Sequence, residues 1–228
     1  MISEILTSFF YSAFSVSILL CYRAGKILNL SLASLFTLGA YLSQSPILAI
    51  LLGAMVGFLL HKITKKLSIT KATVFSLALA IAIEEFLRII FKTEYVIFKV
   101  HNITLFGESI LFPHLLAGII SMGFVILFLA FLFTEKSKNL KIVEEDPELA
   151  ELYGVRVERM RMFILTSTGA LIALLGSLQN PGIVYPTIGW QYLIFAVIVA
   201  TFANIFEEKA YIFAFIFALL ATCLPKLF

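Results

Sequence analysis

Three charged residues interrupt one apolar stretch of this 228-residue sequence, and they are the first candidates for chemistry. Glu84, Glu85 and Arg88 lie in the segment AIAIEEFLRIIF. A charge near the centre of a membrane helix costs about 2.5 to 3.5 kcal/mol on insertion scales, so such residues mark a transport pathway or an internal ion pair. Glu84 and Arg88 share a helix face, which predicts an ion pair with Arg88 reaching towards the interface. The alternative is a polar lining for a solute or a contact between subunits.

An enzyme would need partners for these residues that the sequence lacks. CAAX-type membrane proteases carry E-E-x-x-x-R, whereas EEFLR places the arginine one residue too early. The three histidines, His61, His101 and His114, form no H-E-x-x-H or H-x-x-E-H pair. No G-x-x-x-x-G-K-[ST] phosphate-binding loop occurs either. We therefore predict no catalytic residue, no metal and no cofactor.

A polar segment at residues 141–161, KIVEEDPELAELYGVRVERMR, carries clear helix signals. Asp146 before Pro147 is typical of an N-cap followed by the first helical residue. Glu148 suits the positive helix start, and Gly154 ends the helix. A helix of about two turns is not stable alone in water, so it must dock on its own bundle or on a cytoplasmic partner. The side chains available for docking are Leu149, Ala150, Leu152 and Tyr153.

Two apolar segments contain residues that interrupt membrane helices. Residues 27–42, ILNLSLASLFTLGAYL, include Asn29, Ser31 and Gly39. Residues 178–191, LQNPGIVYPTIGWQ, include Pro181, Pro186 and Gly189. Interrupted segments in corresponding parts of two halves of a protein indicate a transport pathway. Close helix packing through small residues is the alternative explanation for the first segment.

The composition indicates that the residues named above lie in or between membrane-spanning helices. The chain is 61% hydrophobic and 14% charged, with a mean hydropathy of +1.03, which excludes an ordinary soluble domain. A membrane helix needs about 20 apolar residues, and these runs are too uniformly apolar for barrel strands. We therefore predict one all-α domain over residues 1–228, a polytopic transmembrane helical bundle of about eight spans with a short cytoplasmic helix. The apolar runs lie at about residues 4–21, 27–42, 47–63, 72–92, 113–134, 157–178, 190–206 and 210–226.

The distribution of lysine and arginine predicts the orientation in the membrane. If every run crosses once, 13 of the 17 basic residues fall on one side, which the positive-inside rule makes cytoplasmic. The segment 135–161 is then cytoplasmic and both termini are outside. A broken or re-entrant helix at residues 27–42 or 190–206 would change this assignment. The N-terminus shows no cleavage pattern, so we expect the first helix to remain in the mature protein. The charge of +3 lies in short loops, so nucleic acid is not an expected partner.

Three segments together resemble one family of membrane proteins. The block EEDPELAELYGVRVERMRMFILTSTGALIALLGSL resembles the cytoplasmic coupling region of branched-chain amino-acid ABC transporter permeases. Their pattern, E-D-x-x-x-A-x-x-x-G-[IV] followed by a basic residue, is matched by Asp146, Ala150, Gly154, Val155 and Arg159. The family's N-F-A-H-G-x-F-x-x-L-G-A-Y segment is matched at Asn29, Leu38, Gly39, Ala40 and Tyr41. Its P-x-I-G turn is matched at Pro186, Ile188 and Gly189.

Two departures from the family pattern stand beside these matches. The family's A-H-G reads Ser31-Leu32-Ala33 here, which removes an imidazole and a glycine from that turn. A glycine-rich segment expected after the seventh span is replaced by VIVATFANIFEEKAY at residues 197–211.

The resemblance implies a membrane-spanning subunit of an ABC importer, multi-pass in the cell inner (plasma) membrane, that translocates branched-chain or related amino acids. Its expected partners are separate ABC ATPase subunits, a second permease subunit in a homo- or heterodimer, an extracytoplasmic solute-binding protein and the lipid bilayer. A non-ABC membrane channel or scaffold protein is the alternative, ahead of an intramembrane protease. We expect ATPase coupling at Asp146, Glu148, Leu149, Ala150, Gly154, Val155 and Arg159. We expect the substrate pathway at Asn29, Ser31, Gly39, Tyr41, Glu84, Arg88, Pro186 and Gly189.

Overall fold

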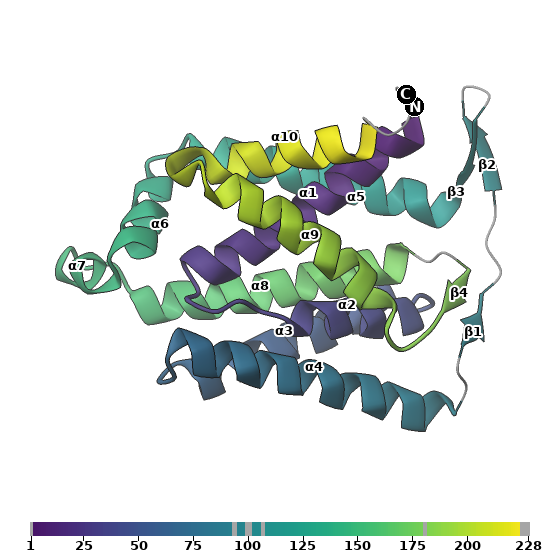
Figure 1. Ribbon diagram of the computed structural model, residues 1–228, viewed down its shortest axis with the longest axis horizontal. Coiled ribbons are helices and arrows are strands. Elements are labelled where there is room, and N and C mark those ends of the chain that lie inside the picture. The colour runs from purple at the N-terminus through teal and green to yellow at the C-terminus, as the bar shows by residue number, and fades with distance from the viewer. Residues whose placement is uncertain (1, 93–94, 99–101, 106–107, 180–181, 224–228) are drawn as a thin grey trace.

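The chain forms a bundle of helices, seen in a computed structural model that describes residues 2–92, 95–98, 102–105, 108–179 and 182–223 (Figure 1). The predicted all-α class is confirmed. The helices are α1 (Ile2–Arg23), α2 (Ser31–Tyr41), α3 (Pro46–Thr64), α4 (Ile69–Phe91), α5 (Phe112–Leu132), α6 (Lys136–Glu145), α7 (Pro147–Leu152), α8 (Val157–Leu178), α9 (Ile188–Asn204), the 3₁₀ turn η1 (Glu207–Lys209) and α10 (Ala210–Cys223).

Four helices in the described part of the chain, α1, α3, α5 and α8, are long and apolar enough to cross a membrane. Most of α1 is buried, because it packs against α5, α8, α9 and α10 and so occupies the middle of the bundle. Only 22% of the most apolar stretch of α5 is buried inside the bundle, as expected for a helix that faces lipid. The rings of Phe10, Phe14, Phe36 and Tyr192 meet in the core beside α1.

The remaining apolar helices are too short or too polar to be counted as membrane spans, so the predicted number of about eight spans is not confirmed. Helix α2 has 11 residues, which corresponds to about 16 Å and does not cross about 30 Å of hydrocarbon. Helices α9 and α10 have 17 and 14 residues. Helix α4 has 23 residues, but Glu84, Glu85 and Arg88 reduce its apolar character. The number of crossings therefore remains a prediction beyond these four helices.

The apolar run predicted at residues 27–42 is helical only from Ser31 to Tyr41. Residues 24–30, which connect α1 to α2, have no helical structure. Hydroxyl groups of α4 satisfy the backbone of this unwound part. The amide of Leu28 donates to Thr73 Oγ1 at 3.3 Å, and the amide of Leu30 donates to Ser76 Oγ at 3.1 Å. Ser76 also donates to the carbonyl of Leu28 at 3.2 Å. Irregular backbone at membrane depth is tolerated where protein covers it in this way.

The two ends of the bundle differ in structure. At one end, which we call the basic end, lie α6, α7, the last residues of α1 and α3 and the first residues of α8 (Figure 1). Lys65 after α3 forms an ion pair with Glu158 of α8 at 3.0 Å. At the opposite end lie two short antiparallel ladders that the sequence did not predict. They pair β1 (Val96–Ile97) with β4 (Ile183–Val184), and β2 (Asn102–Leu105) with β3 (Glu108–Leu111).

Candidate functional site

Helix α7 has the caps that the sequence predicted. Asp146 Oδ1 accepts from the amides of Glu148 at 2.9 Å and Leu149 at 3.1 Å, and Pro147 occupies the first helical position. At the other end Gly154 has a φ of 78°, a conformation that glycine adopts without strain. The amide of Val155 donates to the carbonyl of Ala150 at 3.0 Å, which completes a Schellman motif. Six residues are thus held helical by hydrogen bonds at both ends.

The surface of α7 is divided between one buried side chain and several exposed ones. Ala150 is fully buried against the bundle, whereas Leu149, Leu152 and Tyr153 are 44%, 85% and 72% exposed. Glu148 is exposed on α7, and Arg159 is exposed on the first turn of α8. The main contacts of α7 within the chain are with α6 and α8. The helix is therefore attached by one face and leaves apolar side chains free at the basic end.

The two interrupted segments predicted to form the substrate pathway touch each other. The amide of Gly189, in the first turn of α9, donates to Thr37 Oγ1 of α2 at 3.1 Å. Pro186 is buried just before this contact, and Pro181 lies outside the described residues. At the start of α2, Ser31 Oγ donates to Asn29 Oδ1 at 2.7 Å, and both residues are buried.

Close backbone packing accounts for Gly39 and Gly189 in these segments. A Cβ atom on Gly39 would clash with the carbonyl oxygen of Ala173 in α8, and one on Gly176 would clash with that of Phe36 in α2. A Cβ atom on Gly189 would clash with the carbonyl oxygen of Ala33. Helix α2 is therefore wedged between α8 and α9, as the packing interpretation of small residues predicts.

Tyr41 is buried at the far end of α2. Its ring lies 4.4 Å from the ring of Phe91 at the end of α4, measured between centroids. Its hydroxyl has no hydrogen-bond partner among the described residues. A buried hydroxyl without a partner carries a desolvation cost, and this one lies where α2 and α4 end together.

The predicted ion pair between Glu84 and Arg88 is wrong. Arg88 Nη1 instead pairs with Glu85 Oε1 at 2.7 Å, and both side chains are about half exposed. Glu84 is 7% exposed and accepts a hydrogen bond from the indole of Trp190 in α9. The partners differ because Glu84 faces into the bundle while Glu85 and Arg88 face out, three residues apart. Helices α2, α4 and α9 are thus linked by polar contacts between Gly189 and Thr37 and between Trp190 and Glu84.

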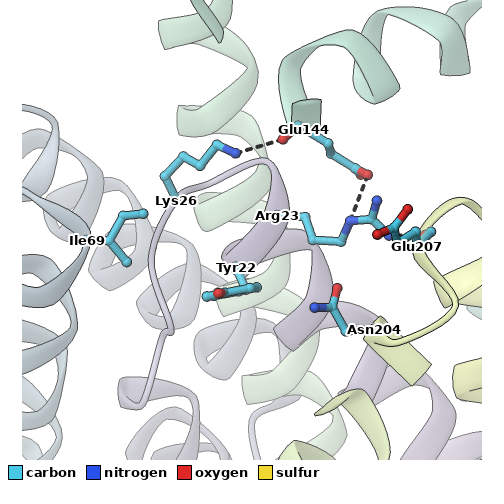
Figure 2. Close-up of a pocket in the computed structure, with 7 residues that line it drawn as sticks. All are labelled: Tyr22, Arg23, Lys26, Ile69, Glu144, Asn204 and Glu207. Atoms are coloured by element: carbon cyan, nitrogen blue, oxygen red, sulfur yellow. Dashed lines mark hydrogen bonds and ion pairs between the residues drawn. The ribbon is translucent and has the colours of Figure 1, made fainter. Parts of the chain in front are cut away.

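A second cluster of polar groups lies at the basic end, around Glu144 of α6. Glu144 Oε2 pairs with Arg23 Nε at 3.0 Å, and its other oxygen accepts from the hydroxyl of Tyr211 in α10. Lys26 Nζ donates to the backbone carbonyl of Glu144 at 2.7 Å, as Figure 2 shows. Arg23 also donates to the carbonyl of Glu207. A cavity of about 280 Å³ lies beside this cluster, lined by Tyr22, Arg23, Lys26, Ile69, Glu144, Asn204 and Glu207.

Burial controls the protonation of this carboxyl group. Only 8% of Glu144 is exposed, and desolvation raises its pKa above the ordinary value of 4.5. The hydrogen bond from Tyr211 and the charges of Arg23 and Lys26 act on the pKa in the opposite direction.

The comparison with known protein families identifies the chain. A family model described as "Branched-chain amino acid transport system / permease component" matches residues 1–225. The chain belongs to this family. No curated protein and no solved structure matches it. The family predicted from the sequence is thereby confirmed over residues 1–225.

Sequence reasoning about this permease missed the Glu144 cluster and its helix. Residues 135–145 are rich in lysine and glutamate, and such a stretch usually forms a solvated surface. Leu140 and Val143 share a helix face with Glu144 and are buried with it, which is the signal that could have predicted α6. The partners Arg23 and Tyr211 are distant in sequence, and no local pattern points to them.

Proposed function

We propose that this chain is the membrane-spanning subunit of an ABC importer that moves branched-chain or related amino acids. ATP is hydrolysed by separate subunits, because the sequence contains no phosphate-binding loop. The observation that carries the proposal is the free apolar face of α7, formed by Leu149, Leu152 and Tyr153. Exposed apolar side chains that cluster at one place are typical of interaction sites. The ATPase docks on this face, and the basic end faces the cytoplasm.

The solute pathway in this proposal follows the contact between α2 and α9. It includes Asn29, Ser31, Gly39 and Tyr41 on the α2 side and Pro186 and Gly189 on the α9 side, with Glu84 from α4. Arg88, which the sequence also predicted for this pathway, faces out of the bundle and is not part of the proposal. Support comes from the meeting of α2, α4 and α9 at the Trp190–Glu84 and Gly189–Thr37 hydrogen bonds. The backbones are in contact there, so this arrangement corresponds to a closed pathway that opens when the helices separate.

The complete transporter also contains a second permease subunit, identical or different, and an extracytoplasmic solute-binding protein. The binding protein docks at the end that carries the four strands, opposite α7 (Figure 1). The assembly lies in the cell inner (plasma) membrane.

Purification from native membranes tests the ATPase docking. We expect a tagged chain, extracted in mild detergent, to bring an ABC ATPase subunit with it, as identified by mass spectrometry. Glu148→Lys reverses a charge on α7, and Gly154→Val forces a branched residue into a left-handed conformation with open space around it. Both variants should insert in the membrane but lose the ATPase. Glu145→Lys is the matched control, because it reverses an exposed charge one residue before the cap of α7.

Two results would contradict the docking role. Normal ATPase recovery from both α7 variants would show that α7 is not the docking element. A monodisperse chain without any ATPase would favour a channel or scaffold protein instead.

A further inference from the structure

We propose that Glu144 is a positioning residue that transmits the movement of α7 to the membrane helices α1 and α10. The inference rests on the proposed function, since it assumes that an ATPase moves α7. It adds a specific mechanical connection to that function, formed by Glu144, Arg23 and Tyr211. No part of the substrate pathway or the docking face belongs to this connection.

The position of Glu144 in the chain makes it suitable for this role. It lies two residues before Asp146, the N-cap of α7. Helix α7 has its main contacts with α6 and α8, so a force on α7 reaches the bundle through these two helices. From α7 the chain passes through Val155 directly into α8. Helix α6 contacts α1 and α10 instead, through the side chain of Glu144.

Three side chains, two of them at or just after the end of α1, contact Glu144 directly. Arg23 at the end of α1 pairs with the carboxylate at 3.0 Å, and Tyr211 in the first turn of α10 donates to it. Lys26, after α1, donates to its backbone carbonyl at 2.7 Å. Arg23 also lies 5.8 Å from the centre of the Tyr211 ring, so the two partners support each other. A shift of α6 therefore cannot occur without moving the ends of α1 and α10 or breaking these bonds.

The ion pair between Arg23 and Glu144 is buried and can therefore transmit a movement. The exposed pair between Lys65 and Glu158 at the same end cannot. The side chains of Arg23 and Glu144 are 18% and 4% exposed, whereas those of Lys65 and Glu158 are 41% and 65% exposed. An exposed pair contributes little, because water replaces the partner at almost no cost. Removing one partner of a buried pair leaves an uncompensated charge away from water. The Glu144 pair therefore resists separation, and the Lys65 pair does not.

The backbone beside the cluster provides an independent observation. Lys26 and Glu207 have φ angles of 54° and 37°, a region that non-glycine residues seldom adopt; the third such residue in the described part of the chain is Lys92, at the end of α4. Strained backbone of this kind persists where the surrounding contacts determine it, and it gathers at functional sites. Both residues are held by the cluster, Lys26 through Glu144 and Glu207 through Arg23. The adjoining cavity of about 280 Å³ gives the side chains of Tyr22 and Arg23 space to move when α6 shifts.

The experiment compares transport with ATP hydrolysis in the assembled transporter. The permease is purified with its ATPase, reconstituted in liposomes with the binding protein, and supplied with radiolabelled leucine, isoleucine and valine. Glu144→Gln should lower the amount of amino acid moved per ATP by about fivefold or more, taking the lower end of the range known for coupling between binding sites as the scale. It should leave ATPase recovery unchanged. Glu145→Gln, an exposed neighbour, is the matched control and should behave as the unmodified chain does.

Two further variants separate coupling from folding. Tyr211→Phe removes one hydroxyl from the cluster and should also lower the amount of amino acid transported per ATP. This variant tests the inference if Glu144→Gln does not accumulate in the membrane. The exchanged pair Arg23→Glu with Glu144→Arg should restore part of the loss. A purely structural role would lower the amount of protein in the membrane without changing this ratio.

The possible failures are distinguishable. Equal transport per ATP in all variants, with the ATPase bound, would overturn this inference and leave the proposed function intact. An unmodified chain that recovers no ATPase would overturn the proposed function and this inference with it.

Discussion

Replacing Asp146 by alanine tests whether α7 works as a preformed docking helix. Asp146 is exposed, and its Oδ1 accepts the two hydrogen bonds that begin α7, at 2.9 and 3.1 Å. Alanine removes these bonds but disturbs no packed side chain. Asparagine keeps an acceptor at the same place and ranks with aspartate as an N-cap. The comparison of Asp146→Ala with Asp146→Asn therefore isolates the cap from the charge.

The expected size of the effect follows from the capping free energy. Loss of an N-cap side chain costs about 1 kcal/mol and at most about 2 kcal/mol. Helix α7 has only six residues and cannot spread this loss over a longer ladder of hydrogen bonds. If the ATPase binds only the helical form, its affinity falls with the helical population of α7, so the capping free energy sets the upper limit of the effect, and 1 kcal/mol corresponds to at most about a fivefold weaker Kd. We therefore expect Asp146→Ala to weaken binding measurably, by at most about 30-fold.

A titration of purified ATPase subunits against the permease in nanodiscs measures this effect. We expect Asp146→Asn to bind within about twofold of the unmodified chain, because it retains the cap. Glu145→Ala controls for the loss of one negative charge at the same end. Equal weakening by alanine and asparagine would show that charge, not the cap, matters. Unchanged binding in both variants would refute the reasoning that a preformed α7 docks the ATPase.

Three other predictions concern separate parts of the chain. Leu152→Glu should abolish ATPase recovery but change the melting temperature little, because the side chain is 85% exposed; unimpaired recovery would exclude Leu152 from the docking face. Gly39→Ala should lower the free energy of unfolding by about 1 to 3 kcal/mol, because its Cβ atom clashes with the carbonyl of Ala173. Gly123→Ala, in α5 with open space around it, should not destabilise in the same unfolding assay, and equal losses would contradict the packing argument. Because burial raises the pKa of Glu144 above 4.5, the folded state binds its proton more tightly than the unfolded state, and stability falls as the pH rises from 4.5 through the raised pKa. Melting curves should show this loss in the unmodified chain relative to Glu144→Gln, and parallel pH profiles would contradict it.

The elements that could be predicted from sequence are those whose signals are local. The apolar run predicted at 157–178 coincides with α8, and the run at 47–63 differs from α3 by one residue at each end. Their lengths and flanking polar residues define them without reference to the rest of the fold. Helix α7 was predictable for the same reason, because Asp146, Pro147 and Gly154 supply both of its caps within nine residues.

The elements that could not be predicted depend on contacts between distant segments. The polar residues of segment 27–42 left a continuous, broken or re-entrant helix open, and the unwound backbone before α2 is stabilised by Thr73 and Ser76 of α4. Glu84 has an acceptable partner four residues away in sequence, yet Trp190 takes that place because Glu84 faces the bundle interior. In each case the local pattern allowed more than one arrangement, and the tertiary structure selected one.

The distribution of rigid and polar contacts suggests how one helix moves others in this permease. Helices α2 and α8 are interlocked by Gly39 and Gly176, whose backbones have no room to slide, so they move together as one body. Helices α1 and α10 are tied to α6 by a polar cluster, and such contacts have a small number of discrete arrangements. A push on α7 therefore reaches two bodies by two routes, through Val155 into α8 and through Glu144 into α1 and α10. Helix α9 touches both bodies, through Gly189 against α2 and through the carbonyl of Ala196, which accepts from Ser15 of α1. Helix α1 also packs against α8 directly, so a difference in movement between the two bodies would act on that contact and on α9, where the proposed solute pathway opens.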